Sequence, residues 1–431
     1  MVDLDPVRAF RPNPEVAAPD DLVCPVYDTL SAEDFAHYAT RPFNAAGFVP
    51  RPAGMPLEPF LESASAALRT AIDRGAYRQD PAASFYVYGI RYVPPTDILE
   101  TLAPEDRRPD YLLLGLVGSL DLAHLAHGQV ALHERTFADR VAERVALTER
   151  TGMSFAPILT GYHGEGHRLN DRLERVLGMR RSSLEFRSTV PPVAEAHLAG
   201  TTHLLWRISA PEDLDALRAE IAPLRLLILD GHHRFTAAAR RQHEGHSSAP
   251  LVMLVDGGDR ALQLLPWQRV LSPSVAAPAE LARRAREEFP EVLDAGPFPT
   301  ADDAIARLRR MRQRNLRGFL LASREGLLEV HGPSSDDAGA DFDLLHGFLD
   351  DTLDIDPELL SFVRSPRGAL AAVAAETGPS AGGTAILLPG LSSRGVEARA
   401  FERGEVMAQK STMFLPKVAE GMLFAPAAGA R

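Results

Sequence analysis

The stretch LLILDGHHRFTAAARR at 226–241 constrains the fold more than any other part of the chain. It opens with a short continuous apolar run, which is typical of a buried strand. Gly231 then tolerates the positive φ that a tight turn needs. The remainder is rich in Ala and Arg, which favours a helix. The sequence therefore predicts a buried strand, a tight turn and a helix whose first turn holds the HHR triplet at 232–234.

This turn has the chemistry of an anion site. The first turn of a helix offers unpaired backbone N–H groups and the positive end of the dipole, and an Arg fork suits phosphate. Asp230 could bind Mg²⁺ through a nucleotide or accept the proton of a hydroxyl group. We therefore expect Gly231, His232, His233 and Arg234 to hold nucleotide phosphates, with Asp230 and His233 also as catalytic candidates. The alternative is a structural turn with incidental histidines.

No metal cage is expected from the protein alone. Adjacent side chains diverge, so His232 and His233 would chelate one ion poorly. The HGEGH stretch at 163–167 has metal-like spacing, but it lies in a Gly-rich loop without an evident third ligand, which favours a solvated loop.

Two further candidates lie far from the turn in sequence. Glu134, in the HERT stretch at 133–136, follows a predicted strand and precedes a predicted helix; it could be a general base, or it could form an ordinary surface ion pair. Of 46 basic residues only Lys410 and Lys417 are lysine, and they lie close together. A compact ammonium differs from a guanidinium in shape. We expect Lys410 to reach the turn and stabilise a transferring group, and the alternative is that the pairing is chance.

Composition excludes several classes of protein. The formal net charge of −12 argues against a protein that coats nucleic acid or an anionic membrane. The first residues lack the basic-then-apolar order of a signal peptide, and no apolar run is long enough to span a bilayer. The single Cys24 excludes an intramolecular disulfide and a Cys-based zinc site. We expect a cytoplasmic protein that acts on a small molecule, in an oligomeric state that the sequence leaves open.

Strands and helices alternate irregularly along the chain, which indicates a mixed α/β or α+β fold. Strands are expected at 84–93, 111–122, 202–208 and 225–229, and an amphipathic helix with a charged outer face is expected in the basic stretch 307–317. We divide the chain into an N-terminal region with the DGHHR turn, a C-terminal α/β subdomain, and a C-terminal segment that folds back on the core and ends in a disordered tail from residue 425. These parts span 1–272, 273–395 and 396–431.

The sequence resembles a bacterial family of uncharacterised proteins, the domain-of-unknown-function family 1015. The motifs that carry the resemblance, in chain order, are VRAFRP, PVYDTLS, HERT with Arg144, HLLWRI, DGHHR, LLPWQRV, DLLHGFL, and KSTMFLPK with Gly421. Two places depart from the family pattern: Ala408 and Gln409 stand where prolines usually precede Lys-Ser-Thr, and the segment TRPFNAAGF is degenerate.

The DGHHR turn in addition resembles the phosphate-binding turn of the ParB/sulfiredoxin superfamily. The reactive cysteine of sulfiredoxin has no counterpart, because His232 stands at that position. The net charge and the α/β segment after the turn differ from the DNA-segregation proteins. The free-serine kinases are most similar, and they have a separate upstream glutamate in the active site. Glu134 matches that glutamate by role, although it lies much farther from the turn here.

The resemblance therefore implies a ParB/sulfiredoxin-like nucleotide-binding core and a nucleotide-dependent phosphotransferase. Its cofactors would be ATP or ADP, with CTP an option, and Mg²⁺. Its substrate would be a small hydroxyl-bearing metabolite such as serine, and Asp230, Glu134, His233 and Lys410 would be the catalytic candidates. A nucleotide-binding sensor without catalysis and a nucleotide or phosphodiester hydrolase remain alternatives.

Overall fold

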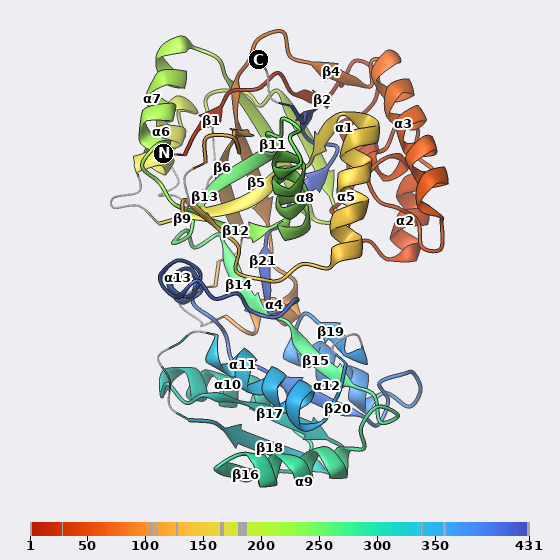
Figure 1. The fold of residues 1–431 in the computed structure, drawn as a ribbon, viewed down its shortest axis with the longest axis vertical. Helices are drawn as coiled ribbons and strands as arrows, with labels where there is room; N and C mark the ends of the chain where they lie inside the picture. The colour runs from red at the N-terminus through yellow and green to blue at the C-terminus, as the bar shows by residue number, and fades with distance from the viewer. Residues whose placement is uncertain are drawn as a thin grey trace.

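The computed structural model describes residues 2–27, 29–102, 107–108, 110–125, 128–163, 168–179, 188–333, 335, 337, 339–356 and 359–428. Strands and helices alternate throughout, so the chain has a mixed α/β fold, as the sequence predicted. Figure 1 shows two halves stacked along the long axis, each built around a sheet and joined by a narrower waist at strands β14 (Gln263–Pro266) and β21 (Thr412–Leu415).

The upper half is built on a nine-stranded mixed sheet. Its order is β10-β11-β5-β6-β13-β9-β12-β7, and β1 pairs with β6. The bounds are β1 Leu4–Asp5, β5 Phe85–Tyr92, β6 Tyr111–Leu120, β7 Val130–Ala131, β9 Ile158–Tyr162, β10 Ala194–Leu198, β11 Thr201–Ile208, β12 Leu226–Asp230 and β13 Leu251–Asp256. Every residue of β6 is buried, because both faces of the sheet are covered. The four predicted strands are confirmed as β5, β6, β11 and β12.

Helices cover this sheet, and two of them form the wall beside the site. Val141 and Val145 of α5 pack against Ala237 of α8, and Figure 1 shows the two helices side by side. The helices of this half are α1 Pro19–Leu22, α2 Ala32–Ala39, α3 Leu57–Asp73, α4 Thr96–Leu99, α5 Ala138–Thr151, α6 Arg168–Val176, α7 Pro211–Ile221 and α8 His232–His243, with a 3₁₀ turn at Ala45–Gly47. None of the helices in the described ranges combines the length and the apolar character that a bilayer crossing needs.

The C-terminal segment returns to the N-terminal half. Strand β23 (Phe424–Pro426) pairs with β2 (Phe10–Pro12) and β8 (Met153–Phe155), and β4 (Tyr77–Gln79) completes that sheet. Strand β22 (Ala419–Glu420) pairs with β3 (Cys24–Pro25). The disordered tail expected from residue 425 is therefore wrong for 425–427, because this backbone bonds to neighbouring strands. Residues 429–431 lie outside the described residues.

The lower half is built on a six-stranded antiparallel sheet of order β16-β18-β17-β20-β15-β19. Its strands are β15 Gln268–Leu271, β16 Glu291–Gly296, β17 Gly318–Ser323, β18 Gly326–His331, β19 Ser361–Val363 and β20 Thr384–Leu387. Its helices are α9 Pro278–Glu288, α10 Ala301–Gln313, α11 Ala340–His346, α12 Pro366–Ala374 and α13 Ser393–Ala398, with π-helical turns at Gly347–Thr352 and Arg399–Arg403. The sheet begins at Gln268, a few residues before residue 273, where the sequence predicted the start of the C-terminal subdomain.

Candidate functional site

The DGHHR turn has the predicted local structure. Strand β12 ends at Asp230, Gly231 adopts φ 91° in the left-handed region, and α8 begins at His232. No side chain caps this end of the helix. A Cβ atom at Gly231 would lie 2.9 Å from Nη2 of Arg234, because the Arg234 side chain folds back over the turn. Glycine is therefore required here both by the backbone angle and by the close approach of Arg234.

Replacement of Gly231 by Ala should lower the free energy of unfolding by about 1–3 kcal/mol through backbone strain, with an added cost from displacing Arg234. The measurement is equilibrium denaturation. Gly245→Ala is the matched control, because Gly245 has φ 88° and its Cβ would meet nothing within 4 Å. Equal losses in the two variants would show that the Arg234 guanidinium moves aside without cost.

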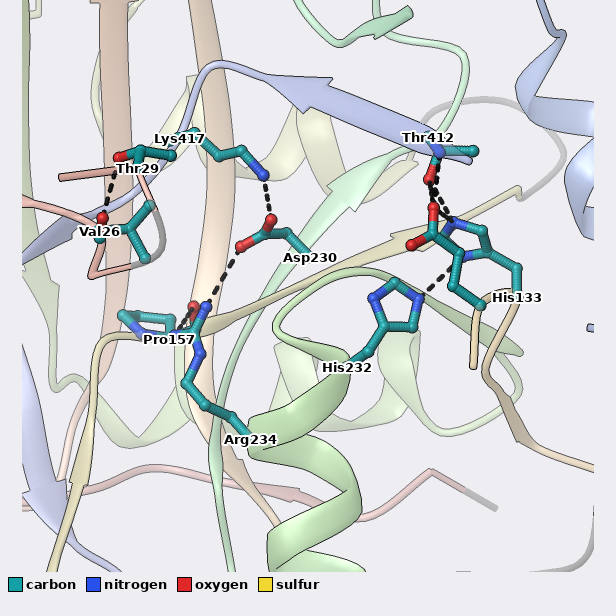
Figure 2. A network of polar contacts seen from close by, with 10 residues as sticks. Val26, Thr29, His133, Pro157, Asp230, His232, Arg234, Thr412 and Lys417 are labelled. Carbon is teal, nitrogen blue, oxygen red and sulfur yellow. Dashed lines mark hydrogen bonds and ion pairs between the residues drawn. The ribbon is translucent and has the colours of Figure 1, made fainter. Parts of the chain in front are cut away.

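Asp230 is buried and paired with two cations (Figure 2). Its Oδ1 accepts a hydrogen bond from Nζ of Lys417, and its Oδ2 accepts one from Nη2 of Arg234 at 3.2 Å. Burial alone would raise the pKa of Asp230, but the Lys417 ammonium and the Arg234 guanidinium outweigh burial and lower the pKa to about 2. A carboxylate this acidic is a weak proton acceptor at neutral pH. The environment suits a fixed counter-charge.

Arg234 contacts its own chain. Nη1 donates to the carbonyl oxygens of Ala156 at 2.6 Å and Pro157 at 3.2 Å, while Nη2 contacts Asp230 (Figure 2). The sequence predicted a free phosphate ligand at this position. The i,i+4 spacing from Asp230 instead gives Arg234 an internal anion. Nε of Arg234 is buried and has no hydrogen-bond partner in the described residues.

The two lysines occupy different places. The contact with the turn that was expected for Lys410 is made by Lys417. Nζ of Lys410 lies 5.1 Å from the centre of the Trp267 ring, and its backbone has φ 56°. Strand β21 separates the two lysines, and an extended chain advances about 3.3 Å per residue, so they cannot share one contact.

The two histidines of the turn are engaged with other parts of the chain. Burial, followed by the neighbouring His133, holds the pKa of His232 well below its usual range. His233 stacks on Phe137, and its Nε2 accepts the Phe137 backbone N–H at 3.1 Å. The expectation that these side chains neutralise phosphate is therefore not met in this arrangement, because one ring is kept neutral and the other holds the start of α5.

Beside the turn lies a second polar group that joins β7, α8 and β21. Nδ1 of His133 lies 2.7 Å from the carbonyl oxygen of Ile228, and its Nε2 lies 2.7 Å from Oγ1 of Thr412. Oε1 of Glu134 accepts from the Thr412 backbone N–H at 2.6 Å and contacts the same hydroxyl. Figure 2 shows His133 and His232 facing each other, with Nε2 of His232 3.2 Å from Nδ1 of His133. Sequence reasoning identified Glu134 here and missed His133, although both lie in HERT.

Arg269 provides a buried positive charge near Glu134. It is fully buried, between the rings of Phe342 at 5.1 Å and Phe362 at 5.4 Å. Burial lowers the pKa of Arg269 to about 9, and the charge of Glu134 acts in the opposite direction. Its Nη2 lies 3.3 Å from the carbonyl oxygen of Lys410, so Arg269 holds that segment in place. Apart from its place in the LLPWQRV motif, nothing in the sequence indicated this role for Arg269.

A small cavity of about 40 Å³ adjoins the turn between α5 and α8. Arg144, Arg234 and Arg241 line it together with Ser154 and Ser248. Nε and Nη1 of Arg241 are buried without a hydrogen-bond partner in the described residues. Glu420 lines the same recess, so the recess is polar, holds charges of both signs, and is far smaller than the sites that whole small-molecule ligands occupy.

The described residues form no metal cage at the turn. The group of potential ligands that they bring together is Asp3, Asp121 and His124, which lies at the β1 end of the sheet. The turn itself offers Asp230, whose charge is already neutralised by two cations. Residues 164–167 of HGEGH lie outside the described residues. His163 contacts Glu397 at 2.5 Å.

Known proteins resemble the chain to different degrees. No curated protein matches it. Among solved structures, a mutant free serine kinase in complex with ADP is 14% identical with a TM-score of 0.38, and the match covers 68% of this chain and 88% of that one. SbnI with a C-terminal truncation from Staphylococcus aureus is 13% identical with a TM-score of 0.35, covering 69% and 82%. A conserved hypothetical protein from Pyrococcus furiosus is 14% identical with a TM-score of 0.35, covering 68% and 91%. These TM-scores are too low to decide the activity of this chain.

A family model described as "Protein of unknown function (DUF1015)" matches residues 4–338, which is most of the chain. The resemblance that the motifs carried is thereby confirmed. The chain belongs to the DUF1015 family.

Proposed function

We propose that this protein is a nucleotide-dependent phosphotransferase that phosphorylates the hydroxyl group of a small metabolite, such as a free amino acid of the serine type. The observation that carries the proposal is the group formed by His133, Glu134 and Thr412 beside the N-terminus of α8. It combines a proton acceptor with a neighbouring anion-binding helix end, which are the two parts that a hydroxyl kinase needs.

A count of hydrogens supports Glu134 as the base. The carbonyl of Ile228 can only accept, so the neutral ring of His133 carries its proton on Nδ1 and Nε2 accepts. Burial lowers the pKa of His133, which favours this neutral form. The Thr412 hydroxyl then has one hydrogen for two acceptors, Nε2 of His133 and Oε1 of Glu134. One added proton would give each of these two atoms a hydrogen, so the geometry favours uptake of the proton from the hydroxyl group of the substrate.

The phosphates of the nucleotide would bind where the helix end meets this small arginine-lined cavity, and the rest of the nucleotide would lie outside it. The first turn of α8 attracts phosphate through its backbone N–H groups and dipole. Arg241 and Arg144 line the adjoining cavity, and Arg234 lies between this cavity and Asp230. ATP or ADP is the proposed cofactor and CTP is an option, because phosphate contacts alone do not select a base.

Mg²⁺ would enter with the nucleotide. Magnesium commonly binds one or two carboxylates together with substrate phosphates. Asp230 would be the single protein ligand if the metal took the place of Lys417 or Arg234 at its carboxylate. Bound there, the metal would neutralise charge on the phosphates.

The proposed step is a direct displacement. The acceptor hydroxyl oxygen forms a bond to the terminal phosphorus, and the bond from that phosphorus to the bridging oxygen breaks, so its electron pair leaves with the shortened nucleotide. The proton of the acceptor hydroxyl passes to Glu134. Asp230 is proposed as the residue that holds Lys417 and Arg234 in place.

Turnover assays test this function directly. The purified protein is incubated with ATP, ADP or CTP and Mg²⁺, with and without L-serine and other small hydroxy acids. We expect nucleotide consumption that depends on the acceptor. Consumption without an acceptor would indicate a hydrolase, and tight nucleotide binding without any turnover would indicate a sensor, and either result contradicts the proposal.

Arg234→Ala should weaken nucleotide binding by about 10–100-fold, because the proposed charge-assisted contact from its Nε, which has no described partner, to phosphate is lost. Calorimetry measures the affinity. Arg240→Ala is the matched control, since Arg240 is exposed on the same helix and pairs with Glu244. Arg241→Ala is the second test variant, because its Nε and Nη1 have no described partner to lose. Unchanged affinity in both Arg234→Ala and Arg241→Ala would disprove nucleotide binding at this turn.

A further inference from the structure

A separate and larger cavity lies at the waist of the molecule. Its volume is about 770 Å³. Its lining comes from β14 and the loop before it in the upper half, and from α10, the start of α12 and the loop after β20 in the lower half. Figure 1 shows β14, α4 and α10 close to this waist. The DGHHR turn contributes no residue to the described lining.

Four arginines line this cavity: Arg260, Arg309, Arg312 and Arg364. Within the described ranges, none of the four forms a salt bridge with a carboxylate, although the chain holds 58 acidic residues and carries a net charge of −12. The carboxylate among the described lining residues is Asp259. A recess with this excess of positive charge in an acidic protein attracts anions.

Arg309 shows that the cationic lining is built into the fold. Its Nη2 donates to the carbonyl oxygens of Glu100 and Leu102, both at 2.6 Å, which holds the guanidinium in place. Its Nε is buried and has no hydrogen-bond partner in the described part of the chain. The carbonyl groups satisfy hydrogen bonds, but among the described residues no carboxylate pairs with this positive charge.

The basic stretch at 307–317 therefore has two kinds of arginine. The sequence predicted an amphipathic helix with its arginines on an outer, solvated face. Helix α10 does bury Ile305 and Leu308, as predicted. Arg310 and Arg312 are both exposed, and Arg309 is half-buried; Arg309 and Arg312 line the cavity, whereas Arg310 is not among the described lining residues. Which side of α10 faces the cavity was not visible in the sequence pattern.

We propose that the waist cavity binds a phosphate-bearing small molecule that has an apolar or aromatic part. Arg guanidinium groups bind phosphate oxygens through paired hydrogen bonds. Leu265, Leu308 and Leu388 provide apolar lining for the rest of the ligand. The volume lies within the range of small-molecule sites. This site is independent of the proposed phosphotransferase site, and its ligand joins the two halves of the chain.

Calorimetry with ATP and with inorganic pyrophosphate as probes tests the site. We expect Arg312→Glu/Arg364→Glu to weaken binding of each probe at the waist site by about ten-fold or more, because two attractive charges become repulsive. Neither side chain has a recorded hydrogen bond to lose within the described chain, so the melting temperature should stay near that of the wild type. The matched control is Arg310→Glu/Arg314→Glu, which makes the same charge change on α10 outside the cavity. It should change affinity less than two-fold.

The outcomes separate this site from the proposed active site. A loss in Arg312→Glu/Arg364→Glu with the Arg310→Glu/Arg314→Glu control unchanged supports the waist site, whether or not Arg241→Ala also loses affinity. A loss in Arg241→Ala alone would place the anion in the α5–α8 cavity and overturn the inference. Equal losses in the cavity and control pairs would show a long-range charge effect and would also overturn it. If the wild type binds neither probe at millimolar concentration, the inference is also overturned.

Discussion

Asp230→Asn should lower the free energy of unfolding by about 3–5 kcal/mol, because removal of one member of a buried ion cluster leaves the others without a counter-charge. The shape of the side chain hardly changes, so the loss reports the charge. Lys417 and Arg234 both contact the carboxylate, and the Lys417 side chain is only 21% exposed. Urea denaturation followed by circular dichroism measures the effect.

The double variant Asp230→Asn/Lys417→Met is the matched control. It removes one positive charge together with the negative charge, so it should recover part of the lost stability. If Asp230→Asn were as stable as the wild type, the ion cluster would contribute nothing, and the two cations would be adequately solvated without Asp230.

The same carboxylate gives a pH signature. The pKa of Asp230 is about 2 in the folded protein, below its ordinary value of 3.8. Its contribution is therefore fully present above about pH 4 and is lost as pH falls toward 2. Buried His133 and His232 have lowered pKa values, so they destabilise the fold at a higher pH, as pH falls below about 6.5. Asp230→Asn should abolish only the step below pH 4.

Glu134→Gln should reduce turnover by about 100-fold or more while nucleotide affinity stays near the wild-type value, because glutamine cannot take up the acceptor's proton. The fold should survive, since the amide oxygen can still accept the Thr412 backbone N–H. Separate measurement of kcat and of nucleotide affinity distinguishes a lost base from lost binding.

Glu149→Gln is the control, because Glu149 is exposed on α5. Thr412→Val is a second variant that keeps Glu134 but removes the hydroxyl between it and His133. Under the proposed mechanism it should shift the pH profile of turnover. Full activity in Glu134→Gln would mean that Glu134 only holds β21 in place.

The sequence by itself determined the local structure at the turn and much of the secondary structure. Strand β12, the left-handed Gly231 and helix α8 all follow from short-range preferences: an apolar run, a residue without Cβ, and an Ala-rich segment. Strand β6 was equally predictable, because a strand that is buried on both faces is apolar throughout. The sequence also identified Glu134 as a candidate site residue, because it lies between a predicted strand and a predicted helix.

Only the tertiary structure decided the partners of these groups. Lys417 contacts Asp230 because β21 pairs with β14 and sets where the chain leaves that strand. Burial makes His232 neutral, and burial also makes Arg269 an interior cation near Glu134. These outcomes depend on segments far apart in the chain, whose packing sets both distance and dielectric environment. The sequence specifies the type of each side chain, but the packed structure determines its charge state and its partner.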